Sequence, residues 1–278
     1  MPIVTFWSNS EKTIGQTVAA SVAATVMAME RNYKILLVSV DVNNDSIENC
    51  FGSQQSNKNI IKNIISTPRI NLDTGTNGLI KMAKSNRVTP ELIRDYTKIV
   101  FKERLEILYS STNEEIPINE QIECYKNIIL NANKYYDYVI VDLKKGLRYT
   151  EILDILELSN VIVLNTEQGI KTLEEFNLNS NVRKFMNSYK VIWNICKYDT
   201  KSKYNIKNLN RTVWKKQPIY NIPYNTLLFD ASSEGKLPEM IVNITTIKSE
   251  DDSKELFNEA NKLIEGIMLR QQELQMRM

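Results

Sequence analysis

The chain has 278 residues, of which 42% are hydrophobic and 24% are charged, a composition that is ordinary for a globular protein with one large or two modest cores. Its formal net charge is only +2, which excludes a polycation built to coat nucleic acid over its whole surface. Histidine is absent, so Ser/His and Cys/His nucleophiles are excluded, and the three widely spaced cysteines match no zinc pattern.

Residues 2–42 predict one βαβ unit of a parallel sheet. We expect a strand from Ile3 to Trp7, a loop from Ser8 to Gly15, a helix from Gln16 to about Glu30 and a second strand from Ile35 to Val40. Such a loop aims backbone N–H groups and the positive end of the helix dipole at one point. The sequence therefore predicts an anion site, of the kind that usually binds phosphate.

The remaining chain alternates between expected strands and helices. Residues 43–104 are polar, with turn signals over residues 73–78 and a helix start at Thr89-Pro90-Glu91. Further strands are expected at 105–109, 136–142, 161–165, 190–195 and 218–222, and further helices around 120–134 and from about residue 251 onward. This alternation predicts a single α/β domain with a mostly parallel sheet flanked by helices.

Two carboxylates end expected strands. Asp41 follows the strand from Ile35, and Asp142 ends the strand after Tyr138. Ligands of parallel sheets bind beyond the carboxyl ends of the strands. In a nucleotide hydrolase one such acid orients the attacking water and the other holds magnesium through its water shell. The alternative is that both acids are solvated turn residues.

Several segments, in this order, resemble the ParA/MinD family of deviant-Walker P-loop ATPases. They are IVTF with its loop and helix, KILLVSVD, YYDYVIVD, VIVLNTEQGIKTLEEF, YKVIWNICKYD and IYNIPYNTLLFDASSEGKLP. The resemblance runs from Met1 to about Pro238. Within the family, DTGTNGLIK, YTKIV and the altered loop look most like the TadZ/CpaE branch, which positions Tad/Flp pilus machinery. The resemblance implies a P-loop NTPase domain over residues 1–248 and a C-terminal helix over 249–278, which packs on the domain and ends in a tail that frays or meets a partner.

The resemblance also implies roles for individual residues. Asp41 matches the catalytic, water-positioning aspartate, and Thr17 and Asp142 match the magnesium-binding pair. Asn194 matches an asparagine placed against adenine, and Ile222 and Pro223 match a loop that flanks the base. The nucleotide-binding loop corresponds to Glu11, Lys12, Thr13, Ile14, Gly15, Gln16 and Thr17.

This loop departs from the family's pattern at decisive positions. Gln16 stands where the P-loop lysine is expected, and Glu11, Lys12 and Thr13 stand where the family has its signature lysine and two glycines. Ser39 replaces the first aspartate of the usual Asp-x-Asp pair. A missing lysine removes charge compensation for the β- and γ-phosphates. We expect ATP or ADP with Mg²⁺ to bind a weakened site and hydrolysis to be slow or lost, with Lys12 as one candidate substitute cation.

A basic stripe and the chain end are candidate partner surfaces. Basic residues recur every four positions near residue 210, and they would share one face if residues 202–216 are helical. They are Lys203, Lys207, Arg211 and Lys215. The stripe is interpreted either as a surface for DNA or anionic lipid or as a solvated helix face. The last helix is expected to bury one apolar face: Leu256, Ala260, Leu263, Ile264, Ile267 and Met268.

Three functions are consistent with these features. The first is a nucleotide-switched positioning or assembly protein that acts as a homodimer with pilus or secretion machinery. The second is a non-catalytic scaffold, and the third is a plasmid or chromosome partition ATPase. No apolar stretch approaches the ~20 residues that cross a bilayer, and no charged and then apolar leader opens the chain. We therefore expect a cytoplasmic protein, either free or at the inner face of the membrane.

Overall fold

The computed structural model describes residues 1–8, 14–41, 46–52, 76–110, 116–143, 149–169, 190–212, 218–246 and 252–276. The strands in these parts are β1 (Ile3–Trp7), β2 (Ile35–Val40), β3 (Lys98–Phe101), β4 (Leu105–Leu108), β5 (Tyr138–Leu143), β6 (Val161–Thr166), β7 (Val191–Tyr198) and β8 (Ile219–Pro223). The helices are α1 (Gln16–Glu30), α2 (Ser46–Phe51), α4 (Thr76–Lys84), α5 (Pro90–Asp95), α6 (Ile118–Ala132), α7 (Tyr149–Leu158), α10 (Ile206–Thr212), α11 (Thr226–Glu234), α12 (Leu237–Thr246) and α13 (Asp252–Gln275).

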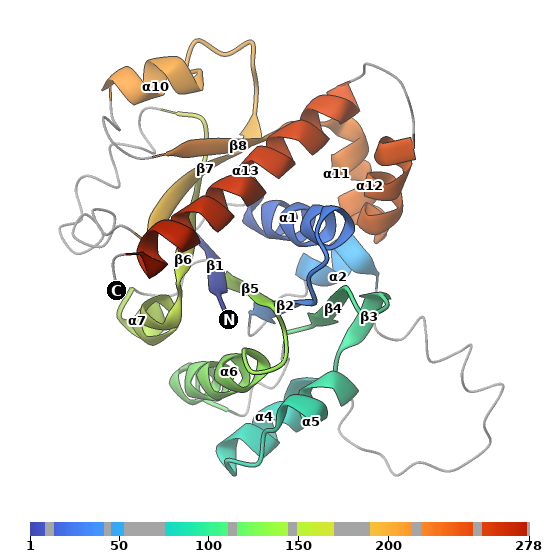
Figure 1. Ribbon diagram of the computed structural model, residues 1–278, viewed down its shortest axis with the longest axis vertical. Coiled ribbons are helices and arrows are strands. Elements are labelled where there is room, and N and C mark those ends of the chain that lie inside the picture. Colours follow the sequence, from blue (N-terminus) through green and yellow to red (C-terminus); the bar gives the residue numbers. More distant parts are fainter. Residues whose placement is uncertain are drawn as a thin grey trace.

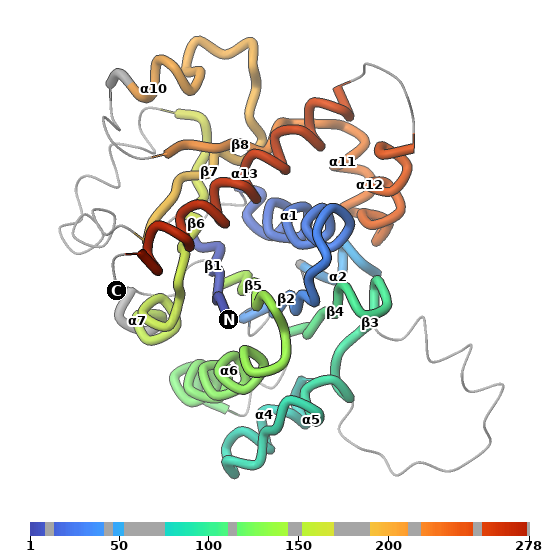
Figure 2. The backbone as a smooth tube through the Cα atoms, in the orientation of Figure 1, coloured from blue at the N-terminus to red at the C-terminus, as the bar shows by residue number. Residues whose placement is uncertain are grey.

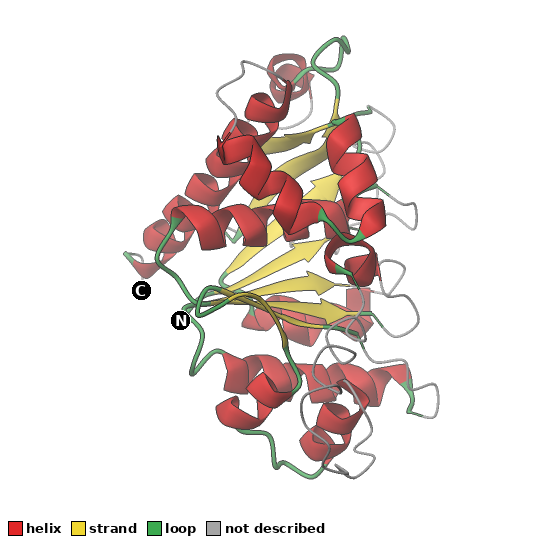
Figure 3. Cartoon of the chain, turned by 90° about the vertical axis from the view of Figure 1, so that its right-hand side faces the viewer, coloured by secondary structure: helices red, strands yellow, loops and turns green. Residues whose placement is uncertain are grey.

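The centre of the protein is an eight-stranded sheet in the order β3-β4-β2-β5-β1-β6-β7-β8. All pairings between these strands are parallel except β3–β4, which is antiparallel. Every residue of β1, β2, β5 and β6 is buried, as expected for strands covered on both faces. The arrowheads of the parallel strands point to one edge of the sheet in Figure 3, so their carboxyl ends meet there.

Helices cover both faces of this sheet (Figure 1). On one face, α1, α2, α11, α12 and α13 share a core with the sheet, and the many alanines of α1 let that helix lie close to the strands. On the other face, α4, α5, α6, α7 and α10 pack on a second core. The predicted α/β domain with a mostly parallel, helix-flanked sheet is confirmed.

The last helix, α13, lies across the face that also carries α1. Its tube runs beside α1 and over β6, β7 and β8 in Figure 2. Five residues of its expected apolar face are buried, namely Leu256, Ala260, Leu263, Ile264 and Ile267, and Met268 is half-buried. In the described part of the chain no helix is both long enough and apolar enough to cross a membrane.

The structure corrects three local expectations. Of the residues with expected turn signals, 73–75 lie outside the described residues, and Thr76 to Gly78 begin helix α4, which buries Leu79 and Ile80 and packs against α6. The antiparallel edge strand β3 was missed, since its four residues carry little periodicity. Residues 202–205 are not helical, so Lys203 precedes the helix α10 that carries Lys207 and Arg211, and the side chain of Arg211 and all of Lys215 lie outside the described residues.

Candidate functional site

The connection from β1 to α1 ends at Gly15, which caps the helix. Gly15 has φ +94° and ψ 18°, a left-handed conformation that glycine adopts without the penalty of a Cβ. The first N–H groups of α1 therefore face the edge of the sheet at which the parallel strands end. Ile14 is buried beside Gly15. The predicted loop residues Glu11, Lys12 and Thr13 lie outside the described residues.

Gln16 is turned inward, toward the strand ends. Its Nε2 donates to Asp142 Oδ1 and to the Leu143 carbonyl oxygen, at 2.7 Å each, and to the Phe6 carbonyl oxygen at 3.2 Å. The side chain is 1% exposed. Residue 16 thus joins the start of α1 to the ends of β1 and β5 through a neutral amide.

The two predicted acids lie on neighbouring strands. Asp142 is buried, and it is aligned with Ser39 of β2 and with Phe6 of β1. Asp41 directly follows β2 and is half-buried. Thr17, the second predicted metal residue, is buried in the first turn of α1. The strand register therefore brings Gln16 and Asp142 into contact, with Asp41 at the end of the adjoining strand.

The negative charge of Asp142 affects the pKa of a nearby buried thiol, that of Cys50. Burial raises the pKa of the Cys50 thiol to about 12, and the negative charge of Asp142 raises that pKa further. Cys50 is therefore an uncharged core residue of α2 at neutral pH.

A small cavity of about 50 Å³ lies beside Gly15. It is bounded by the first turn of α1, the end of β7, and the end of β8 with the start of α11. Its lining residues are Gly15, Val18, Cys196, Lys197, Ile222, Pro223, Tyr224, Asn225, Leu228 and Phe229. Three residues predicted from the sequence meet here, namely Gly15, Ile222 and Pro223. The side chains of Tyr224 and Phe229 are 58% and 59% exposed, so part of the cavity wall is open to solvent.

Asn194 does not line this cavity. Its Nδ2 donates to Asn165 Oδ1 at 2.8 Å and to Cys196 Sγ at 3.4 Å. Its Oδ1 is buried and has no hydrogen-bond partner among the described residues. The Asn194 side chain is therefore buried within the sheet and does not reach the cavity wall. Its Oδ1 is an unsatisfied hydrogen-bond acceptor.

Lys197 is a site residue that the sequence analysis missed. It sits at the irregularity between β7 and β8 with φ +53°, an uncommon conformation for a residue other than glycine. A Cβ added at Gly15 would lie 3.5 Å from Lys197 Cε. The lysine stem therefore covers Gly15. Its position near the carboxyl end of an expected parallel strand, three residues after Asn194, could have marked Lys197 as a candidate site residue.

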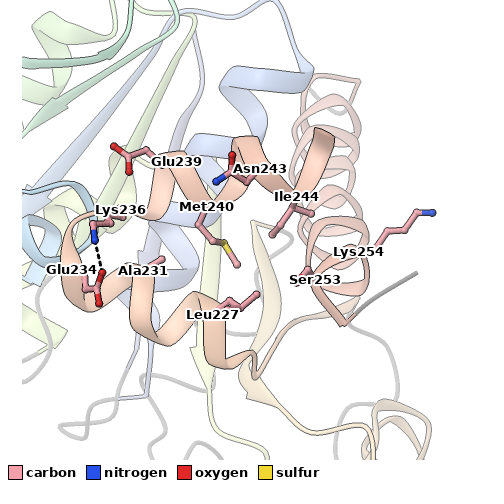
Figure 4. A pocket seen from close by; sticks show the side chains of 10 residues that line it. All are labelled: Leu227, Ala231, Glu234, Lys236, Glu239, Met240, Asn243, Ile244, Ser253 and Lys254. Carbon is pink, nitrogen blue, oxygen red and sulfur yellow. Dashed lines mark hydrogen bonds and ion pairs between the residues drawn. The ribbon is translucent and has the colours of Figure 1, made fainter. Parts of the chain in front are cut away.

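A larger cavity lies elsewhere. It measures about 390 Å³ and lies between α11, α12 and the start of α13 (Figure 4). Met240, Leu227 and Ile244 face it, and the ion pair of Lys236 with Glu234, at 2.7 Å, stands at its rim. None of the predicted site residues lines it.

Comparison with solved structures identifies the architecture. A ParA family ATPase from Chlorobium tepidum TLS superposes with a TM-score of 0.68 over 93% of this chain and 98% of its own, at 15% sequence identity. The fold is that of ParA/MinD ATPases. No protein-family model and no curated protein matches the chain in sequence.

Two further ParA/MinD structures contain nucleotide. A putative plasmid partition protein from Borrelia burgdorferi B31, bound to AMPPNP, has a TM-score of 0.64 at 18% identity and covers 97% of this chain and 98% of its own. MinD from Pyrococcus horikoshii OT3, complexed with Mg-ADP, has a TM-score of 0.59 at 14% identity, and 93% of each chain is covered. The ParA/MinD fold of the present chain is therefore one on which nucleotide sites are built.

Proposed function

We propose that this protein is a ParA/MinD-like nucleotide-binding positioning or assembly protein with weak or absent ATP hydrolysis. The observation that carries the proposal is the cavity beside Gly15, where the start of α1, Lys197 and the β8–α11 connection meet. This cavity lies at the carboxyl ends of parallel strands, where α/β folds bind their ligands.

The residues around the cavity match the chemistry of an adenine base, although a cavity of about 50 Å³ must widen to hold one. Ile222, Pro223 and Leu228 offer apolar contact to a base, which would enter past the exposed side chains of Tyr224 and Phe229. At the phosphate end, the N–H groups of α1 and the Lys197 ammonium would supply positive potential.

Slow or absent hydrolysis follows from the chemistry of residue 16. A neutral amide cannot compensate the charge that develops on the transferring phosphoryl group as a P-loop lysine does. Asp41 remains at the end of β2 as the proposed water-positioning residue. The engagement of Gln16 with Asp142 specifically favours the second candidate function, a non-catalytic scaffold in which nucleotide binding is retained or lost.

The finer assignments rest on sequence resemblance. We propose Tad/Flp-type pilus or secretion machinery as the partner, with the protein acting as a homodimer in the cytoplasm. Lys203 and Lys207 are candidate contacts for DNA or anionic lipid, and Lys203 lies over the Tyr204 ring at 5.0 Å from its centroid. The partition function is the third candidate and would use the same basic residues for DNA.

Nucleotide binding is tested by a thermal-shift and calorimetric comparison of the full chain with ADP and ATP. At a hundredfold its Kd, a bound nucleotide adds ~2.7 kcal/mol of stability. Lys197→Met is expected to weaken binding about tenfold, or ~1.4 kcal/mol, because it removes the ammonium beside Gly15 and keeps a similar stem. Lys201→Met is the matched control, since Lys201 is exposed and does not line the cavity. Equal affinities of the two variants would contradict the role of Lys197, and absence of any binding would refute the proposed function.

Hydrolysis is tested by measuring ATP turnover of the wild type beside Asp41→Ala. We expect both to show the same low rate, because the loss of the P-loop lysine already removes the main charge stabilisation. Fast turnover that disappears in Asp41→Ala would establish an active ATPase and refute the weakened site.

A further inference from the structure

Gln16 is held in one orientation by its surroundings. The amide nitrogen carries two hydrogens and faces three acceptors: Asp142 Oδ1, the Leu143 carbonyl and the Phe6 carbonyl. Turning the amide over would place Gln16 Oε1 against all three, which is repulsive. Because Gln16 and Asp142 are 1% and 5% exposed, these contacts are sheltered from water and energetically costly to break.

This contact determines what the Asp142 carboxylate can bind. A buried carboxylate requires donors or a cation. Magnesium is bound through one or two carboxylates and keeps several of its waters, so a carboxylate near it typically accepts a hydrogen from a metal-bound water. Gln16 Nε2 donates to Asp142 Oδ1 in the same manner, at 2.7 Å. The Gln16 amide therefore supplies the hydrogen bond that a metal-bound water would otherwise donate to Asp142 Oδ1.

The neighbouring groups do not rebuild a metal site. Among the described residues no three Cys, Asp or Glu side chains gather to hold an ion by themselves, so a magnesium ion here would be held through one or two carboxylates and the nucleotide phosphates. Gln16 Oε1 is buried without a hydrogen-bond partner in those ranges, as is Ser39 Oγ, so neither atom is presented to a hydrated cation. The residues around Asp142 thus do not fit the magnesium that the fold family implies.

We propose that this protein binds adenine nucleotide without a divalent cation, and that Gln16 sets this preference by donating to Asp142 Oδ1. The inference rests on the proposed function, because it concerns the same site. Thr17 and Asp142 would then not bind a metal ion. The role of Asp142 would be to hold the start of α1 through its hydrogen bond from Gln16. Positive charge at the phosphates then comes from the protein, and Lys197, whose stem covers Gly15, is a candidate for it.

The test is calorimetric titration of the full chain with ADP, in excess Mg²⁺ and in excess EDTA. For the wild type we expect the apparent affinity in excess Mg²⁺ to be no higher than in EDTA, because Mg²⁺ withdraws free ADP into Mg-ADP, whereas a metal-dependent site would lose about tenfold or more on chelation. Mn²⁺ electron paramagnetic resonance on the ADP complex gives a second readout, and we expect no protein-bound Mn²⁺ signal.

The variant Gln16→Lys removes the amide from Asp142 and restores the residue type that the family resemblance expects. We expect it to gain metal-dependent ADP affinity and a bound Mn²⁺ signal. Gln272→Lys makes the same chemical change at an exposed position of α13 and should behave as the wild type.

The outcomes separate the two proposals. Wild-type binding that needs Mg²⁺, or stoichiometric Mn²⁺ in its ADP complex, overturns the metal-independent site and leaves the proposed function standing. Absence of ADP binding with both Mg²⁺ and EDTA overturns the proposed function and this inference together. The wild-type measurements decide the matter even if Gln16→Lys fails to fold.

Discussion

Replacing Gly235 with alanine is expected to lower the free energy of unfolding by about 3 kcal/mol, since it combines left-handed strain with a backbone overlap. Gly235 ends α11 with φ +74°, and its N–H donates to the Asn49 carbonyl oxygen at 2.8 Å. An added Cβ would lie 2.7 Å from both the Cα and the N of Gly52. The backbone of α2 would have to move away from α11.

Gly52→Ala is the matched control for this effect. Gly52 has nearly the same φ, +73°, but its Cβ would lie 3.7 Å from Lys98 Nζ and 3.8 Å from the Gly235 carbonyl oxygen. Only the strain of the left-handed conformation remains, so we expect a loss of about 1 kcal/mol. Equilibrium urea unfolding measures both variants. Equal losses would show that the contact between α2 and α11 is not tight.

Replacing Gly266 with alanine is expected to destabilise the protein by about 2 kcal/mol, although alanine favours a helix by about 1 kcal/mol over glycine. Gly266 lies in α13, where the helix packs on β8. An added Cβ would overlap the Tyr220 ring, at 2.5 Å from Cε2 and closer still to Cζ and Oη. Helix propensity predicts that the alanine variant is more stable, whereas the overlap with Tyr220 predicts that it is less stable, so the sign of the measured change shows which effect dominates.

The partner variant Tyr220→Leu separates the overlap from helix propensity. In the double variant the ring is absent, so Gly266→Ala should become neutral or stabilising relative to Tyr220→Leu alone. The coupling free energy follows from urea unfolding of the four proteins. A Gly266→Ala effect that is the same with and without the ring would contradict the proposed packing of α13 on β8.

Much of the fold could be predicted because its strands are buried on both faces. The bounds expected for the first strand, helix and second strand agree with those of β1, α1 and β2. Continuous apolar runs identified β5, β6, β7 and β8 to within a few residues. The edge strand β3 and the helix α4 were not recognised, because neither has a long apolar pattern and α4 follows turn-forming residues.

The sequence by itself determined an α/β protein with a strand, a loop and a helix at its start, and with neutral Gln16 where a lysine was expected. Local periodicity and residue chemistry are enough for both conclusions. Only the tertiary structure decided what Gln16 binds, because its partner Asp142 is 126 residues away in the chain. The same holds for Lys197, which reaches Gly15 only because β7 ends beside the start of α1. Such contacts depend on strand order and register, which no local pattern encodes.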